Sequence, residues 1–454
     1  MDITTTSASA PTHAPAAEPV PASGKFKLLV VALIIVAISE WIGVAKFKLG
    51  PGDVVLLPMV WALLLAALWG ILQGRLPNVA RIETATQGYA NSLLNAGLSV
   101  LVVKLCLTVG GSFDVVMKAG WALIFQEFGH AVGTLALGLP IALILGLKRE
   151  AVGATFSVGR EGSLIIIGQR YGMASPEGRG VLAEYVTGTV VGALFIATLA
   201  GFLASLGIFD PRSLAMGAGV GSASLMAAAL GAVAAHSPAE MLPQLTALAA
   251  AANLLVIVCG LYTTLFISLP LCNWLYRKLE PVLGRLTRRG REAREDLPGL
   301  QGVGGPAESP FTLRDTVLSW IAMGLGVTLA NMISYKGELL SSLEGMLVLI
   351  VITAALTAAK RLLPRKIPFI VLLAVGAALI GIPGWLPLTP YILAATGKIN
   401  FLPFTTIVLA LAGFSVAKDL PMFRRLGWRI VVVSLAAETG TFLCAAMIAE
   451  FFHR

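Results

Sequence analysis

Long apolar runs, each followed by a short polar connection, dominate the pattern of this 454-residue chain. A helix needs about 20 apolar residues to cross a bilayer, and most of the runs are close to that length. The pattern therefore predicts an all-α integral membrane protein, a polytopic helical bundle of about 11–13 spans. The runs cover residues 28–44, 54–72, 86–109, 130–147, 151–170, 181–206, 213–234, 244–270, 316–333, 340–359, 367–384, 402–417 and 428–452.

Two of these runs contain residues that are unusual in a helix facing lipid. The run from Leu214 to Ala235 is rich in glycine and serine in its first half, and the run at 151–170 contains the pair Arg160-Glu161. Lipid satisfies no backbone N–H or C=O group, so a break at that depth must face protein or a wet cavity. We expect two broken helices, interrupted near Gly159–Gly162 and Gly217–Ser222, whose breaks approach each other in the membrane interior.

Basic residues predict the orientation. Residues 276–315 form the longest polar connection and carry eight Arg or Lys, which places them in the cytoplasm. If both broken runs cross, the chain has thirteen crossings, with the N-terminus inside and the C-terminus outside. The amphipathic segment 113–128 is expected to lie in the interface or to re-enter. The predicted domains are a disordered tail at 1–24, an N-terminal membrane bundle at 25–275, a basic cytoplasmic linker at 276–315 and a C-terminal membrane bundle at 316–454.

A weak internal repeat links the two bundles. The segment that begins KFKLGPGDVV at Lys46 resembles the segment that begins KRLLPRKIPF at Lys360, and Gly120-Trp121 is matched by Gly427-Trp428. Under the predicted orientation the paired spans run in opposite directions, as in the inverted repeats of many transporters. A chance likeness between two apolar helices is the competing interpretation.

Composition supports the membrane class and excludes others. The chain is 57% hydrophobic and 13% charged, whereas about a quarter of a soluble protein is charged. The net charge of +9 comes mostly from loops, so it indicates topology and no nucleic-acid partner. The cysteines form no CxxC pair, so no metal site and no cofactor is expected. No phosphate-binding loop, nucleophile elbow or HExxH motif indicates an enzyme. We expect a multi-pass protein of the inner (cytoplasmic) membrane and leave homodimer formation open.

Ionisable residues at membrane depth are costly, which makes each one a candidate for function. Arg160 is suited to clamp a carboxylate with two parallel hydrogen bonds, with Glu161, Ser157 and Ser163 close by in the chain. A structural role in ion pairs with other helices is an equally good interpretation of Arg160 and Glu161.

Glu184 precedes Gly188 and Gly192 at four-residue spacing and is a candidate for proton or sodium coupling, although GxxxG spacing more often marks a packing face. Asn253 is a candidate ligand or an interhelical hydrogen-bonding residue. Glu438 and Glu127 are weaker candidates, whereas residues toward span ends, Glu40, Glu344 and Lys104, are expected to snorkel. The candidate substrate- and ion-binding residues are Ser157, Arg160, Glu161, Ser163, Glu184, Gly219, Gly221, Ser222, Ser224 and Asn253.

At GAGVGSASLMAAALGA and SVGREGS the chain resembles an uncharacterised bacterial inner-membrane family, a domain of unknown function, from about residue 30 onward. More distantly, its broken segments are similar to those of the superfamily of sodium–glutamate symporters, keto-deoxygluconate permeases and bile-acid-type carriers. That resemblance implies inverted repeats with crossed, broken helices and transport of organic anions with sodium or protons. No carrier signature matches residue by residue, so it implies no particular substrate.

These observations favour a secondary active transporter of a small organic anion, a carboxylate or an amino acid, coupled to sodium or protons. The alternative is a membrane channel or pore. A channel is expected to carry polar residues periodically along several spans, whereas here they gather in two broken segments.

Overall fold

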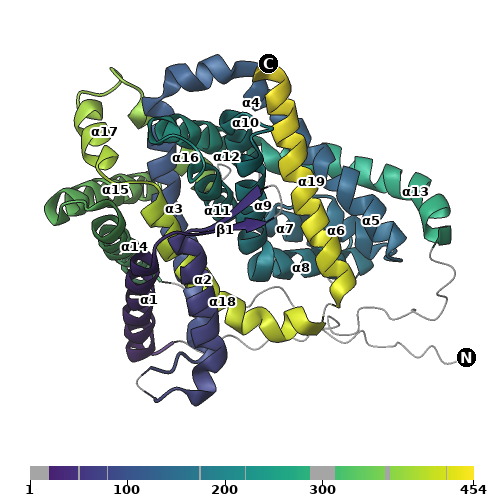
Figure 1. The fold of residues 1–454 in the computed structure, drawn as a ribbon, viewed down its shortest axis with the longest axis horizontal. Coiled ribbons are helices and arrows are strands. Elements are labelled where there is room, and N and C mark those ends of the chain that lie inside the picture. Colours follow the sequence, from purple (N-terminus) through teal and green to yellow (C-terminus); the bar gives the residue numbers. More distant parts are fainter. Residues whose placement is uncertain are drawn as a thin grey trace, which may run out of the picture.

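The computed structural model describes residues 20–49, 52–78, 80–172, 175–219, 221–286, 312–362, 369–425 and 427–453, and this part of the chain is almost entirely helical (Figure 1). Within it, nine helices are long and apolar enough to cross a membrane, and α17 and α18 form a further apolar pair that is bent by 66° at the break between them. The prediction of a polytopic, all-α membrane protein is confirmed.

The helices up to residue 286 are α1 (Ala22–Ile42), α2 (Pro58–Ile71), α3 (Thr84–Gly111), α4 (Phe113–Gly133), α5 (Leu139–Ile144), α6 (Glu150–Thr155), α7 (Arg160–Arg170), α8 (Pro176–Thr187), α9 (Ala193–Leu206), α10 (Pro211–Ala218), α11 (Ala223–Ala234), α12 (Leu242–Thr263) and α13 (Leu269–Leu286). The helices after residue 311 are α14 (Leu313–Tyr335), α15 (Leu339–Ala359), α16 (Phe369–Gly381), α17 (Thr389–Gly397), α18 (Leu402–Arg425) and α19 (Trp428–His453). Most of the predicted linker and nearly all of the predicted N-terminal tail lie outside the described residues.

Three long helices continue through a π-helical turn rather than ending there. These turns are η2 (Thr134–Gly138) between α4 and α5, η3 (Gly188–Gly192) between α8 and α9, and η5 (Thr264–Ser268) between α12 and α13. Short 3₁₀ turns, η1 (Leu72–Arg75) and η4 (Ala239–Met241), extend α2 and precede α12. Such π-helical turns are rare overall, and those that occur often lie at functional sites.

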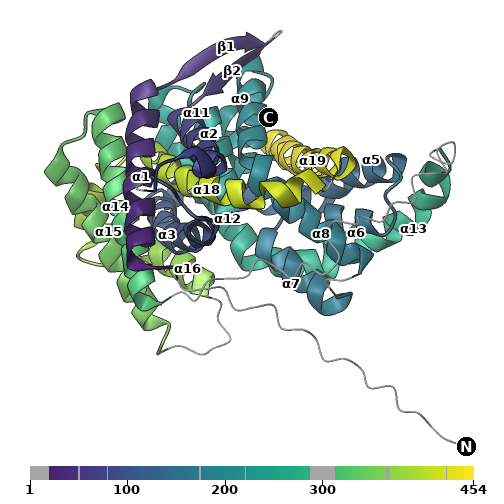
Figure 2. The same cartoon turned by 90° about the horizontal axis from the view of Figure 1, so that it is seen from below.

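A small antiparallel hairpin joins α1 to α2 and was not predicted. Strand β1 (Ala45–Leu49) pairs with β2 (Gly52–Leu56) in a register that places Lys46 opposite Val55. The predicted span at 54–72 therefore begins later, at Pro58. Figure 2 shows this hairpin at one end of the molecule, beside α9 and α11, whereas α7 and α8 lie toward the opposite end.

Segments far apart in the sequence pack in pairs. Helix α2 packs on α18, α3 on α16, and α4 on α19. At the α4–α19 crossing, a Cβ atom on Gly133 would overlap the backbone of Gly440, and one on Gly440 would overlap the backbone of Gly133. These two glycines are 307 residues apart, which is the offset between Gly120 and Gly427 in the sequence repeat.

The repeat extends to the backbone at the start of α4 and α19. Gly120 and Gly427 have φ values of +41° and +74°, and both precede a tryptophan. The helices run antiparallel, because Gly129 packs near Ala445 and Gly138 near Ala437. These contacts are those that an inverted repeat produces at its axis. The amphipathic segment 113–128 is part of α4, which turns sharply at Gly120 and then continues as a span.

Candidate functional site

The first broken segment is a hairpin whose two arms lie on one helix. Helices α6 and α7 both pack against α8. At its base, Arg149 donates to Asn273 (3.1 Å), which donates to the hydroxyl of Tyr171 (3.0 Å). Arg149 also pairs with Glu177 at the start of α8 (2.5 Å). Because residues 149 and 171 flank the hairpin and share Asn273, the chain enters and leaves on the same side.

The second broken segment is a hairpin on the continuation of that helix. Helices α10 and α11 both pack against α9. The backbone N–H of Asp210, just before α10, donates to Glu450 near the end of α19 (2.9 Å). Gly201, near the end of α9, lies against Ala232 and His236 at the far end of α11. Both ends of this hairpin therefore lie beside the last turns of α9.

The two hairpins enter from opposite sides of the molecule. One base lies at the start of α8 and the other at the end of α9, and the 31 residues from Pro176 to Leu206 form one long helix between them. At 1.5 Å per residue that helix is about 46 Å long, which is the thickness of a whole bilayer. The sequence left open whether runs 151–170 and 213–234 cross the membrane; in the structure neither crosses, because each returns to its own side.

The tips of the hairpins meet in the interior. Val158 of the first tip and Ala218 of the second line one small cavity together with Glu438 of α19. Ile196, Leu225, Thr441 and Phe442 complete its wall, and its volume of about 10 Å³ is the space of a single water molecule. Two tips that approach each other are what the glycine and serine content of both segments predicted.

One carboxylate, Glu438, lines this cavity, and a second, Glu184, lies near it across Gly188. Glu184 of α8 and Glu438 of α19 are 2% and 3% exposed. A Cβ atom on Gly188 would lie 3.4 Å from Oε1 of Glu438 and 3.8 Å from Oε1 of Glu184, so both acids share the groove along η3. Glu184 therefore lies deep in the bundle rather than at the outer interface. Burial makes the charged form of a carboxylate costly unless it has a hydrogen-bonding or ionic partner.

The second tip is held by Asn253 of α12. Its Nδ2 donates to the carbonyls of Gly219 (3.0 Å) and Gly221 (3.2 Å), which the end of α10 leaves unbonded. Gly221 has a φ of +111°, a conformation that favours glycine. Asn253 is thus an interhelical hydrogen-bonding residue, the structural alternative considered for it.

Serines cap the start of α11 at the same tip. The hydroxyl of Ser222 accepts from the backbone N–H of Leu225 (3.3 Å), and it lies 3.1 Å from the hydroxyl of Ser224. Ser224 is buried. The break spans Gly219 to Ser222, within the predicted range.

The first tip is built from Ser157 and Gly159. The hydroxyl of Ser157 accepts from the N–H of Gly159 (3.0 Å), and α7 begins at Arg160. Ser163 is 1% exposed, and its hydroxyl has no hydrogen-bond partner among the described residues. The break lies at Phe156–Gly159, three residues before the predicted one, because Gly162 is already helical. The side chains of Arg160 and Glu161 lie outside the described part of the structure.

Sequence reasoning ranked several residues too low. Glu438 was a weaker candidate, yet it lines the cavity at which the two tips meet. Glu40 and Lys104 were expected to snorkel at span ends, but both are buried, and Lys104 donates to the carbonyl of Thr396 at the end of α17 (2.6 Å). The ETGT run at Glu438 was the available signal, since an acid followed by small polar residues is unusual inside a span.

The comparisons with known proteins identify the family of this chain. The search of curated proteins and the search of solved structures gave no match. The family model described as "Protein of unknown function (DUF3100)" matches residues 37–278, which is more than half of the chain and includes both hairpins. The chain therefore belongs to the DUF3100 family.

Proposed function

We propose that this protein is a secondary active transporter of a small organic anion, coupled to sodium ions or protons. One observation carries the proposal: two hairpins reach inward from opposite sides, and their tips meet at one small cavity. A site closed by a separate hairpin toward each side is suited to alternating access, in which one closure opens while the other holds.

The tips supply groups that favour an anion. Helices α7 and α11, 11 and 12 residues long, both begin at a tip, and the N-terminus of a helix presents unpaired N–H groups and a partial positive charge. Ser222 and Ser224 add hydroxyl donors at the second tip.

Glu184 and Glu438 supply the coupling. Two buried carboxylates in one groove are stabilised when a sodium ion or a proton binds, and that bound charge in turn favours an anion at the adjacent tips. Release of the cation on the other side then releases the anion as well. This reciprocity makes transport depend on the cation gradient.

A channel is less well supported. The space between the tips holds about one water molecule, and Val158, Ala218, Leu225 and Phe442 give it mostly apolar walls. A pore needs a continuous polar pathway through the bundle. Here the tips of the two hairpins lie across the space where such a pathway would run.

The test is uptake by the purified chain in proteoliposomes, with a panel of labelled mono- and dicarboxylates and amino acids. We expect accumulation of at least one acid when a sodium or proton gradient is imposed. Glu184→Gln and Glu438→Gln should abolish accumulation, while equilibrium exchange of the acid continues. Glu240→Gln, which changes an exposed carboxylate before α12, is the matched control.

Two results would contradict the proposal. Conductance that persists without saturation would indicate a pore. Accumulation that is unchanged in both glutamine variants would remove Glu184 and Glu438 from coupling.

A further inference from the structure

A second cavity lies away from the hairpin tips, near the end of the molecule that carries β1 and β2. It has a volume of about 360 Å³ and is lined by residues of α1, α2, α14 and α18 together with the segments that join them. Ser334, Tyr335 and Val44 at its rim are exposed, so a ligand can reach it from solvent. A cavity of this size suits a small organic molecule.

The carboxylate of Glu40 forms the polar floor of this cavity. Glu40 is 6% exposed, and it accepts hydrogen bonds from Thr406 Oγ1 (2.6 Å) and from Ser334 Oγ. In the part of the chain that the structure describes, no Lys, Arg or His forms an ion pair with it. A buried carboxylate without a counter-charge favours a cation beside it.

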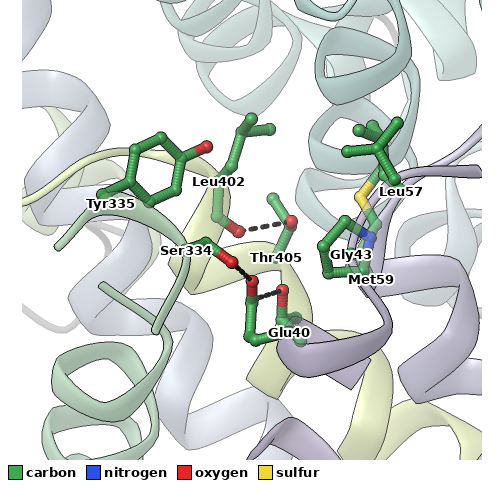
Figure 3. A pocket seen from close by; sticks show the side chains of 11 residues that line it. Glu40, Gly43, Leu57, Met59, Ser334, Tyr335, Leu402 and Thr405 are labelled. Carbon is green, nitrogen blue, oxygen red and sulfur yellow. Dashed lines mark hydrogen bonds between the residues drawn. The ribbon is translucent and has the colours of Figure 1, made fainter. Parts of the chain in front are cut away.

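The other walls are mostly apolar. Figure 3 shows the carboxylate of Glu40 between Tyr335 on one side and Leu57 and Met59 on the other. Thr405 donates to the carbonyl of Leu402 (2.6 Å), so its hydroxyl proton is already used. The cavity thus presents one anionic group and an aromatic ring within an apolar pocket.

We propose that this cavity binds a small organic cation, an ammonium group on an apolar body. The ammonium would pair with Glu40, and the ring of Tyr335 would add a cation–π contact. A bare metal ion fits less well, because it gains nothing from apolar walls and needs more oxygen ligands than Glu40, Ser334 and Thr406 provide. This inference does not rest on the proposed transport function.

The cavity also contacts the second hairpin. A Cβ atom on Gly231 of α11 would lie 2.8 Å from Cε of Met59 and 3.1 Å from Cδ2 of Leu402, and both side chains line the cavity. A ligand that displaces Met59 or Leu402 would therefore change their contacts with α11, the second helix of that hairpin.

The test is calorimetric titration of the purified full chain with phenethylammonium and with its neutral counterpart 2-phenylethanol. We expect the ammonium to bind at least about tenfold more tightly than the alcohol. Glu40→Gln should lower the affinity for the ammonium at least about tenfold and leave that for the alcohol unchanged. Glu344→Gln is the control, because this exposed carboxylate pairs with Lys398 outside the cavity.

A rim variant makes the test independent of the folding of Glu40→Gln. Val44 is 52% exposed, so Val44→Trp narrows the opening without disturbing the core and should weaken binding of both molecules. Equal affinities for ammonium and alcohol, or an affinity for the ammonium that Glu40→Gln does not change, would overturn the proposal.

The ammonium can come from a soluble amine or from a lipid headgroup. Titration in nanodiscs of phosphatidylglycerol, whose headgroup carries no ammonium, with and without phosphatidylethanolamine, separates these sources. Weaker binding of the probe in the presence of phosphatidylethanolamine identifies the headgroup as a competitor, whereas unchanged binding identifies a soluble ligand.

Discussion

Gly188 and Gly192 determine how close the carboxylate of Glu438 lies to α8 and α9. A Cβ atom on Gly192 would lie 2.6 Å from Oε1 of Glu438, whereas one on Gly188 would lie 3.4 Å from the same atom. The first distance is shorter than any van der Waals contact, and the second is a tight but tolerable one. Alanine at Gly192 therefore requires the carboxylate of Glu438 to move, whereas alanine at Gly188 does not.

This difference predicts that Gly192→Ala destabilises the protein more than Gly188→Ala does. We expect Gly192→Ala to lower the free energy of unfolding by about 1–3 kcal/mol, because the carboxylate and its surroundings must move, and Gly188→Ala to lower it by less than about 1 kcal/mol. The measurement is unfolding of the detergent-purified variants. Gly74→Ala, where no atom lies within 4 Å, is the control and should be neutral. Equal losses at both glycines would show that Glu438 is not fixed against Gly192.

At the scale of residues, the sequence identifies candidate functional residues better than it predicts which residues contact them. Glu184, Asn253 and the glycines of the second tip were identified because charged, amide and glycine residues are rare in apolar spans. The four-residue spacing of Glu184, Gly188 and Gly192 places them on one face but does not reveal which residue faces them. The proximity of Glu438, 254 residues further along, therefore required the structure.

The two broken segments show the same limit at the scale of elements. Each has the length and hydropathy of a crossing helix, and each carries a break that the sequence predicted. Hydropathy does not distinguish a helix that crosses from two half-helices that return, because both bury about 20 apolar residues. The base contacts at Arg149 and Asp210 decide between them.

The hairpin geometry predicts a labelling pattern. Starting from a variant without native cysteines, Lys148→Cys and Gln169→Cys should react with a membrane-impermeant maleimide from one side, because both residues are exposed at the base of the first hairpin. Ile208→Cys and Glu240→Cys should react only from the opposite side. If either segment crossed the membrane, its two flanking cysteines would react from different sides.

At the scale of the whole molecule, α4 and α19, which are far apart in the sequence, meet at a close glycine contact. Gly133 and Gly440 meet there, and each excludes a side chain on the other. The sequence repeat matched these two helices through Gly120-Trp121 and Gly427-Trp428, but it did not predict that they pack on each other. The sequence alone could not show that the repeat is genuine, because two apolar helices resemble each other whether or not they are related.

A double-mutant cycle tests this shared contact. Gly133→Ala and Gly440→Ala should each lower the free energy of unfolding by about 1–3 kcal/mol, since either Cβ forces α4 and α19 apart. The double variant should lose clearly less than the sum, because the first change already opens the contact for the second. Gly397→Ala, with no atom within 4 Å, serves as the control. Strict additivity would show that the glycines act at separate contacts.

The π-helical turn η3 also fixes the rotational phase of the long helix that separates the hairpin bases. Such a turn holds one residue more than a regular turn, and one added residue rotates everything after it by about 100°. The side chains of α9 are therefore rotated about the helix axis relative to where a regular continuation of α8 would place them, although the chain between them never leaves the helix. Glu184 takes its direction from the first phase, and Ile196 reaches the cavity between the tips through the second. The inserted residue thus sets the angle about the helix axis between Glu184, before the turn, and Ile196, after it.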